Sequence, residues 1–399
     1  MIRTAVLGFP RMGPNRELKL ALERHWAGES SPDELHAVAR ELRAAAWSRM
    51  REAGIDSIPS GDFSLYDQML DTAWGLGAIP ERFGRPEVDD LPAYFAMARG
   101  ADEARPLEMT KWFDTNYHYL VPELRPDQAF EARPSHWVEQ FEEAMAAGVP
   151  TRPVIVGPFT FLSLAKGVDR PLDLLDRLVP AYREILDALA AAGADEVQID
   201  EPALALDHPA ADLDRFERAF LDLAGNGGPK VALATYFAGL DQGTLLERLA
   251  RLPIHELHLD LVRAPEQLER AVDAFAGTGA RLSLGLVDGR NVWITDPDLA
   301  LDRLDFAARA LGHERLTIAP SCSLLHVPHQ AAGEDGIDPA VRRWLAFAVE
   351  RLDELALLAR AATASPAERD GLLGLARERV GSRRKSSRTW DPEGRARTA

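Results

Sequence analysis

Short apolar runs alternate with longer amphipathic stretches along most of the chain. The short runs are rich in β-branched residues and contain few polar ones, which is typical of parallel strands buried on both faces. Eight segments have this pattern and are predicted to be strands, namely Thr4–Phe9, Ser57–Asp62, Arg152–Gly157, Glu196–Asp200, Lys230–Phe237, Glu256–Val262, Arg281–Val287 and Leu316–Pro320. The stretches between them have helical periodicity, so the chain is predicted to alternate strand and helix.

Capping signals support the predicted helices. Ser31 is an N-cap before Pro32 at the first helical position, and apolar residues then recur at helical spacing until Gly54. The same helix–glycine–strand punctuation returns at Gly148 and Gly193. Repeated βα units with eight strands predict a closed α/β fold, the (β/α)8 TIM barrel. A doubly wound open sheet is the alternative, although no Gly-x-Gly-x-x-Gly follows the first strand.

Two parts of the chain depart from this alternation. Residues 80–136 are rich in Pro, Arg, Asp and aromatic residues, show no strand period and are too long for a plain loop. We therefore predict an excursion after the second strand that covers one face of the barrel. Residues 377–399 contain eight basic and three acidic residues. This composition predicts a basic linker or tail, with the barrel occupying residues 1–376.

Composition narrows the classes of function. The chain has 46 Lys and Arg against 63 Asp and Glu, which gives a net charge of −17. This balance argues against nucleic-acid and membrane partners, because both need a basic face. The single cysteine excludes a disulfide within the chain and a cysteine-rich zinc module. No apolar run approaches the roughly 18 residues of a membrane span, so we expect a cytoplasmic protein.

In a TIM barrel the active site lies at the carboxyl ends of the strands. The polar residues at or just after the predicted strand ends are Arg11, Asp62, Asp200, Glu201, Tyr236, Asp260, Asp288, Arg290, Asn291, Ser321 and Cys322. Asp200 and Glu201 are adjacent on a strand, so only one of them can face the barrel mouth. The other is expected to cap a helix or to pair with an arginine. Asp200, Asp260 and Cys322 are the candidate catalytic residues.

A metal site is one hypothesis for the same strand ends. His258 and Asp260 are two residues apart on one strand, so they share a face. Together with Cys322 they offer a ligand set that zinc accepts. The alternative is that His258 and Cys322 are packing residues of the core.

The segment from Glu108 to Leu124 mixes four aromatic residues with Lys, Asp, Asn and His. Such mixing in an irregular segment is typical of a ligand-binding surface. The alternative is an aromatic patch that pins the excursion to the barrel.

Several motifs, in order along the whole chain, closely resemble the N-terminal half of cobalamin-independent methionine synthases. They are Gly8–Gly13 with Arg16–Lys19, Glu108–Phe113 with Thr115–Tyr119, Gln198–Leu204, Asp288–Trp293 and Ser321–His326. The resemblance implies one of two face-to-face barrels. It also implies a part in methyl transfer from 5-methyltetrahydrofolate polyglutamate, the methyl donor, to homocysteine in methionine biosynthesis.

The resemblance further implies a binding site for the polyglutamate tail of the folate. In the family this site comprises the segment that matches Arg16, Glu17, Leu18 and Lys19, and the lysine that matches Lys111. A tail of carboxylates needs fixed cations, which Arg and Lys supply. The alternative is that Lys19 and Lys111 are ordinary solvated surface residues.

The family's zinc belongs to its C-terminal barrel, so the resemblance implies no cofactor in this chain. By analogy between the two halves, the zinc-ligating His-x-Cys strand corresponds to Thr235–Phe237, which carries neither ligand. A zinc-ligating Glu corresponds roughly to Asp260, and a second Cys to Cys322. The chain alone is therefore expected to be inactive in methionine formation, because zinc is what holds the homocysteine thiolate.

Three hypotheses of function remain open from the sequence. The first is the N-terminal half of a methionine synthase that acts with a separate zinc-bearing barrel. The second is a stand-alone, non-catalytic module that binds folylpolyglutamate. The third is a repurposed barrel enzyme that uses Asp200, Asp260 and Cys322 on another substrate.

Overall fold

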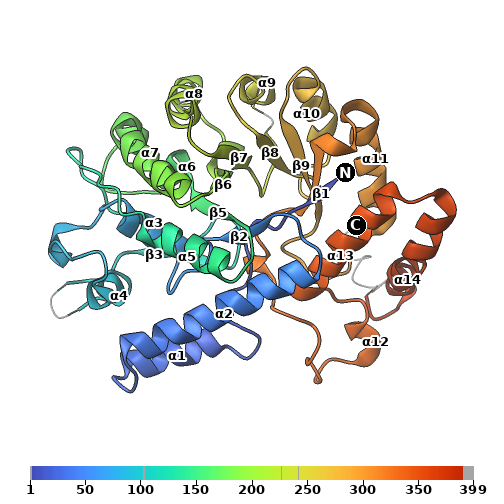
Figure 1. Cartoon of the computed structure of the whole chain (residues 1–399), viewed down its shortest axis with the longest axis horizontal. Helices are drawn as coiled ribbons and strands as arrows, with labels where there is room; N and C mark the ends of the chain where they lie inside the picture. The colour runs from blue at the N-terminus through green and yellow to red at the C-terminus, as the bar shows by residue number, and fades with distance from the viewer. Residues whose placement is uncertain (1, 102–103, 226, 241, 390–399) are drawn as a thin grey trace, which may run out of the picture.

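Eight parallel strands form a ring at the centre of the molecule (Figure 1). The computed structural model describes residues 2–101, 104–225, 227–240 and 242–389. The strands are β1 (Arg3–Thr4), β2 (Ile58–Ser60), β5 (Thr151–Val156), β6 (Glu196–Asp200), β7 (Lys230–Ala234), β8 (Glu256–Asp260), β9 (Arg281–Val287) and β10 (Leu316–Pro320). Their order in the sheet is β1-β10-β9-β8-β7-β6-β5-β2.

Backbone hydrogen bonds join the two outer strands of this order. Ser57 N donates to Thr4 O at 2.9 Å, and Val6 N donates to Ser57 O at 3.1 Å. A parallel bridge between Ala5 and Ser57 accompanies them. The ring is therefore closed, which confirms the predicted barrel and makes the open-sheet alternative wrong.

Helices surround the ring, as Figure 1 shows. The barrel helices are α2 (Pro32–Glu52), α5 (Ser135–Ala146), α6 (Pro158–Ser163), α7 (Leu175–Ala191), α8 (Ala210–Ala224), α9 (Leu245–Leu249), α10 (Gln267–Phe275), α11 (Pro297–Leu311), α13 (Ala348–Thr363) and α14 (Pro366–Lys385). The others are α1 (Glu17–Trp26), α3 (Gln68–Gly75), α4 (Leu91–Arg99) and α12 (Pro339–Arg342). None of the helices in the described part of the chain is long and apolar enough to span a membrane.

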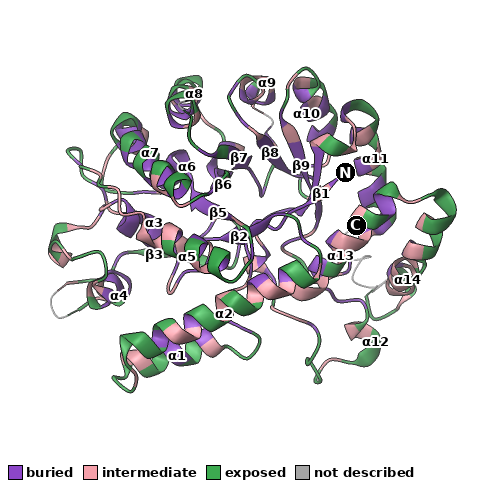
Figure 2. Cartoon of the chain, in the orientation of Figure 1, coloured by how far each residue is buried: buried purple, intermediate pink, exposed green. Residues whose placement is uncertain are grey.

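The apolar strands and the inner faces of the helices form one large core (Figure 2). Strands β8 and β10 are buried along their whole length. The sequence of β10 is mostly apolar, as expected for a buried strand, whereas β8 also buries Glu256, His258 and Asp260. The predicted start of α2 is also confirmed. Ser31 and Glu34 form a reciprocal capping box, and Gly54 follows the helix with a φ of 78°.

The predicted excursion, residues 80–136, carries regular structure that its sequence did not indicate. It contains α4, the start of α5, and an antiparallel hairpin of β3 (Met109–Lys111) and β4 (His118–Leu120). The segment thus contains two strands although its sequence shows no strand period. Its apolar residues join α1, α2 and α3 in a second, smaller core beside the barrel.

The proposed boundary between residues 376 and 377 falls inside α14, which continues to Lys385. The prediction of a linker or tail is therefore wrong for residues 377–385. Val380 of this stretch is buried, Arg377 pairs with Asp298 at 2.8 Å, and Arg384 pairs with Asp296 at 2.6 Å. The rest of the predicted tail, 390–399, lies outside the described residues.

Candidate functional site

The parallel strands bring four of the predicted residues to one mouth of the barrel. Asp200 is the last residue of β6 and Asp260 the last residue of β8. Asp62 follows β2 by two residues, and Cys322 follows β10 by two. The mouth formed by the strand ends is thus the place where an active site of this fold would lie.

Asp200 ends a ladder of buried polar side chains inside the barrel. Arg152 Nη2 donates to Gln198 Oε1 at 2.8 Å, and Gln198 Nε2 donates to Asp200 Oδ1 at 2.7 Å. The Tyr236 hydroxyl donates to Asp200 Oδ2 at 2.9 Å. Burial raises the pKa of Asp200 to about 7, against the opposing effect of these hydrogen bonds. Both carboxylate oxygens are therefore held by the protein itself.

Glu201 points away from the mouth, as expected for one member of the adjacent pair. Its carboxylate accepts hydrogen bonds from Phe159 N at 3.0 Å and Thr160 N at 2.6 Å, in the first turn of α6. Burial raises the pKa of Glu201 to about 7. A side chain at Gly157 would lie 2.2 Å from this carboxylate, so only glycine fits there. Glu201 therefore caps a helix.

The proposed metal ligands do not form a ligand group. His258 Nδ1 lies 2.9 Å from Ser283 Oγ, and its Nε2 lies 3.3 Å from Ser321 O. The carboxylate of Asp260 accepts hydrogen bonds from the backbone N–H groups of Phe237, Val262 and Arg263 at 2.8–3.1 Å.

Burial raises the pKa of Cys322 well above its ordinary value, which disfavours the thiolate that a metal requires. Within the described residues, no group of three His, Cys, Asp or Glu side chains is placed to hold a metal ion. The geometry thus contradicts the hypothesis of a metal site at His258, Asp260 and Cys322, and these residues do not fit a zinc ion.

The turn of the β3–β4 hairpin lies over the mouth and is tied to three strand ends. Asp114 accepts hydrogen bonds from Arg263 Nη2 at 2.8 Å and from Arg290 Nη1 at 2.7 Å. The Phe113 ring lies 5.4 Å from Phe237, between ring centroids. These contacts join the excursion to the ends of β7, β8 and β9.

Aromatic rings complete this closure. His326 lies 5.5 Å from the Phe237 ring and 6.1 Å from the Tyr117 ring. Trp112 is fully buried and packs edge to face against Tyr119 at 5.6 Å. Phe113 and Tyr117 thus pack against the barrel, whereas Trp112 and Tyr119 pack against each other within the hairpin. The contacts of Phe113 and Tyr117 agree with the second of the two interpretations of that segment.

The residues expected at the folate tail divide into anchors and exposed cations. Leu18 is fully buried, and the carboxylate of Glu17 holds Asn15 through its backbone N at 3.0 Å. Arg16 begins α1 with a φ of 64° and is exposed. Lys19 is exposed, with a weak pair to Glu23 at 3.7 Å. Glu17 and Leu18 therefore shape the segment, whereas Arg16 and Lys19 offer charge to solvent.

Lys111 lies on β3, opposite His118 in the hairpin, and is exposed. Among the described residues, no carboxylate pairs with its ammonium group. Arg11, in the loop before α1, donates to the carbonyls of Ser64 at 3.1 Å and Tyr66 at 2.5 Å, which ties that loop to the end of β2. No hydrogen bond or ion pair links Lys111 to Lys19 within the described part of the chain.

Several residues of the mouth were absent from the sequence-based candidates. Asp114 and Arg263 are 149 residues apart in sequence, so no local spacing signals their ion pair. The interior ion pairs of Arg152 with Glu196 and Glu256, both at 2.9 Å, were also missed. Charged residues on otherwise apolar strands were the available signal for the second group.

Residues 3–311 match the family model described as cobalamin-independent synthase, N-terminal domain. The chain belongs to this family. A 5-methyltetrahydropteroyltriglutamate–homocysteine methyltransferase of Chelativorans sp. is 49% identical, in an alignment that covers 98% of this chain and 52% of that protein. One of the same name from Streptomyces coelicolor is 47% identical over 99% of this chain and 52% of that protein.

The chain of this cobalamin-independent synthase domain thus spans about half the length of the curated relatives that it matches. Solved structures share its fold at low identity. A putative vitamin-B12-independent methionine synthase from Listeria monocytogenes has a TM-score of 0.62 at 15% identity, covering 92% of this chain and 100% of that one. A methyltransferase from Methanosarcina mazei has a TM-score of 0.54 at 16% identity.

Proposed function

We propose that the chain contributes the N-terminal barrel to methyl transfer from 5-methyltetrahydrofolate polyglutamate to homocysteine, and that it binds the glutamate tail of the methyl donor. The observation that carries the proposal is the exposure of the cations of Arg16, Lys19 and Lys111 in the motifs typical of the family. The relatives are named for a triglutamate substrate.

The charge distribution supports this assignment. The protein carries a net charge of −17, which repels an anionic ligand at long range. A folate tail therefore needs local cations that are not already neutralised. Lys19 has one exposed, 3.7 Å pair, and Lys111 has no carboxylate partner in the described structure. Most other ion pairs nearby are tighter, such as Lys166 with Glu108 at 2.6 Å.

The barrel mouth supports a binding role more than a chemical one. Asp200 is held by Gln198 and Tyr236, Asp260 is held by backbone N–H groups, and the mouth is covered by the hairpin. We propose that the homocysteine thiolate is activated on a separate zinc-bearing barrel. The residues of this chain would then position the donor through its tail and leave the reacting methyl group to the other barrel.

The test compares folate triglutamate with the monoglutamate by isothermal titration calorimetry. The wild-type chain is expected to bind the triglutamate several-fold more tightly, because each exposed pair contributes about 0.2–1 kcal/mol. The Lys19→Ala and Lys111→Ala variants together remove this preference. Lys230→Ala is the matched control, since Lys230 is an exposed lysine at the start of β7, the opposite end of the strand from the mouth. Equal affinity of the wild-type chain for both folates contradicts the proposal.

A stand-alone folate-binding module is the second candidate, and the observation that favours it is that the polar groups of the mouth are held by the protein itself. The two candidates differ in one assay. Methionine formation after addition of a separate zinc-bearing C-terminal half supports the first. Folate binding that is unchanged in the presence of that half, with no methionine formed, supports the second.

A further inference from the structure

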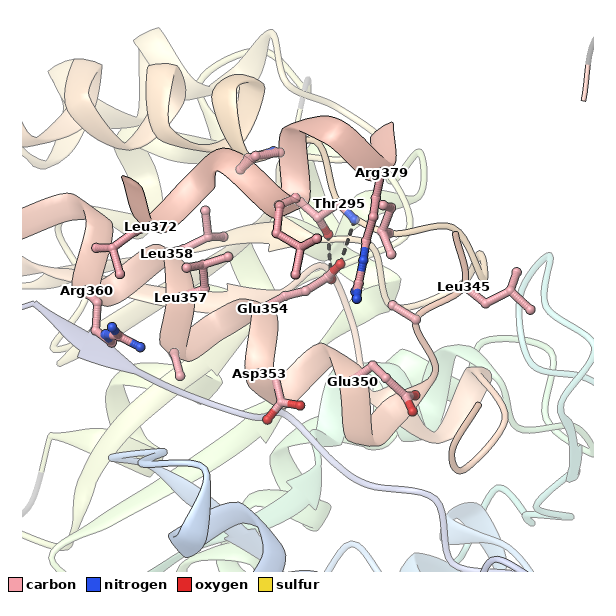
Figure 3. A pocket seen from close by; sticks show the side chains of 16 residues that line it. Thr295, Leu345, Glu350, Asp353, Glu354, Leu357, Leu358, Arg360, Leu372 and Arg379 are labelled. Atoms are coloured by element: carbon pink, nitrogen blue, oxygen red, sulfur yellow. Dashed lines mark hydrogen bonds between the residues drawn. The ribbon is translucent and has the colours of Figure 1, made fainter. Parts of the chain in front are cut away.

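A pocket of about 440 Å³ lies between α13 and α14, away from the residues of the barrel mouth and of the folate-tail segment. Its walls combine leucine side chains with a small number of charged groups, as Figure 3 shows. The volume is within the range of small-molecule sites in proteins, roughly 300–1,000 Å³. The apolar wall consists mainly of Leu345, Leu357, Leu358, Leu372 and Leu375.

Helix α14 presents apolar surface to this pocket that the core does not use. The buried residues of α14 are Leu373 and Val380, so its packing against the barrel employs a different side of the helix. Leu375 lines the pocket and is 59% exposed. An apolar ligand chain would remove this leucine surface from water, with a gain of about 25 cal/mol per Å².

The three carboxylates of the pocket are already neutralised or hydrogen-bonded. Glu354 accepts hydrogen bonds from Thr295 N at 2.7 Å and from Arg351 Nη1 at 2.6 Å. Glu350 accepts backbone N–H groups, including that of Phe347 at 3.0 Å. Asp353 pairs with Arg49 of α2 at 3.1 Å. Arg49 and Arg351 therefore balance the charges of Asp353 and Glu354, whereas Glu350 has hydrogen bonds but no ion pair among the described residues.

Arg360 and Arg379 line the pocket, and neither has an ion-pair partner in the described structure, but only Arg379 has a buried Nε that lacks an acceptor. The side chain of Arg379 reaches from α14 toward α13, as Figure 3 shows, and no described carboxylate forms an ion pair with it. Its Nε is buried without a hydrogen-bond acceptor. An arginine stays charged at any ordinary pH, and an unsatisfied buried donor costs free energy. The Nε and Nη edge of the guanidinium is also the edge that a carboxylate can bind with both oxygens.

We propose that this pocket binds a small amphiphilic carboxylate, with its carboxylate on Arg379 and its apolar chain against the leucines of α13 and α14. The leucine wall supplies affinity in proportion to chain length, and the unpaired guanidinium selects a negative head group. The proposal does not depend on the folate-tail assignment, because none of the residues of that assignment lines the pocket.

The proposal is tested by calorimetric titration of the chain with butanoate, hexanoate and octanoate. Affinity should rise about fourfold for each methylene that enters the pocket, since burying one methylene contributes about 0.8 kcal/mol. Octylammonium, which has the same chain and the opposite charge, should not bind. Failure of octanoate to bind, or equal binding of octylammonium, overturns the proposal.

Two variants locate the site. Arg379→Gln should weaken octanoate binding about tenfold, and Leu375→Asp should abolish it by placing a negative charge in the leucine wall. The matched controls are Arg85→Gln and Leu221→Asp, because Arg85 is an exposed arginine outside the pocket and Leu221 is a 48% exposed leucine on α8. Both controls should bind octanoate like the wild type. Unchanged binding in Arg379→Gln and Leu375→Asp, or equal losses in the controls, contradicts the proposal.

Discussion

Arg152 provides the sharpest test of how the barrel holds its polar interior. Its side chain is only 5% exposed, and its Nη1 donates to Glu196 and to Glu256, both at 2.9 Å. Glu256 is also buried, and its other oxygen accepts a hydrogen bond from Thr317 Oγ1 at 2.5 Å. Burial opposes the charge on Arg152, but the two glutamates outweigh it and raise the Arg152 pKa.

Replacement of Arg152 by methionine keeps the apolar stem and removes the charge. Glu256 then remains buried with no cation, whereas Glu196 retains Arg3 at 3.4 Å. Breaking a buried ion pair in this way typically costs 3–5 kcal/mol. We therefore expect Arg152→Met to lower the free energy of unfolding by about 3–5 kcal/mol at neutral pH, through the orphaned charge of Glu256.

The measurement is the midpoint of urea unfolding, compared at constant m-value. Two further variants test the cause. Arg3→Gln removes a half-buried partner of the same Glu196, at the longer distance of 3.4 Å, and should cost less than about 1 kcal/mol. The double variant Arg152→Met/Glu256→Gln removes the orphaned charge and should recover part of the loss. A loss below about 1 kcal/mol in Arg152→Met, or no recovery in the double variant, refutes the reasoning.

Three further predictions concern the mouth. Burial raises the pKa of Asp200 from 3.8 to about 7 in the folded chain. Between these pH values the unfolded chain releases the proton of Asp200 while the folded chain keeps it. The contribution of Asp200 to the free energy of unfolding therefore falls as the pH rises through this range. Asp200→Asn should flatten this dependence in unfolding midpoints taken at pH of about 4.5 and about 7.5, and an unchanged slope counts against it. Asp114→Ala removes both arginine pairs of the hairpin turn, so amide hydrogen exchange at residues 112–117 should accelerate, whereas Glu87→Ala should leave it unaltered. The purified chain should form no methionine from homocysteine, and Cys322→Ser should change the stability of the chain more than any activity. The prediction is contradicted if the chain alone forms methionine and the Cys322→Ser variant does not.

Sequence pattern predicted the barrel because most of its strands are largely apolar, although β6 and β8 carry buried polar side chains inside the barrel. The bounds of β6, β9 and β10 agree with the predicted segments to the residue. The first two strands were predicted too long, since residues such as Leu7 and Phe9 are buried beyond the end of the strand ladder. Apolar patterning reports burial, and burial alone does not distinguish a strand from a packed loop.

The two regions that were mispredicted share a cause. The β3 and β4 strands have three residues each, which is too short for a periodic signal. In the C-terminal segment the density of arginine obscured an apolar stripe, of which Leu373 and Val380 are seven residues apart and both buried. Arginine is compatible with a helix. Ion pairs of Arg377 with Asp298 in α11, and of Arg384 with Asp296 at the N-cap of α11, hold α14 against the barrel.

The sequence predicted which residues lie at the candidate site better than it predicted their contacts. Strand ends located Asp200 and Asp260 because a barrel brings such positions together wherever they lie in the sequence. Hydrogen-bond partners decided the rest, and these come from distant segments, as with Tyr236 on Asp200 and Asp114 on Arg263. The distinction between a metal ligand and a packing histidine, for His258, depended on Ser283 and on a backbone carbonyl.

The distribution of satisfied and unsatisfied charge separates the binding surface from the core. Inside the barrel, each carboxylate described above is matched by a guanidinium, a hydroxyl or backbone N–H groups, so a charged ligand entering there would have to displace existing partners. On the surface, Lys111 lacks such a partner, and Lys19 holds a weak one. An anion that binds Lys111 therefore breaks no ion pair of the described residues, and at Lys19 it competes only with the 3.7 Å pair to Glu23. On this ground we propose that a folate tail binds at the hairpin and the first helix, and not among the satisfied charges of the mouth.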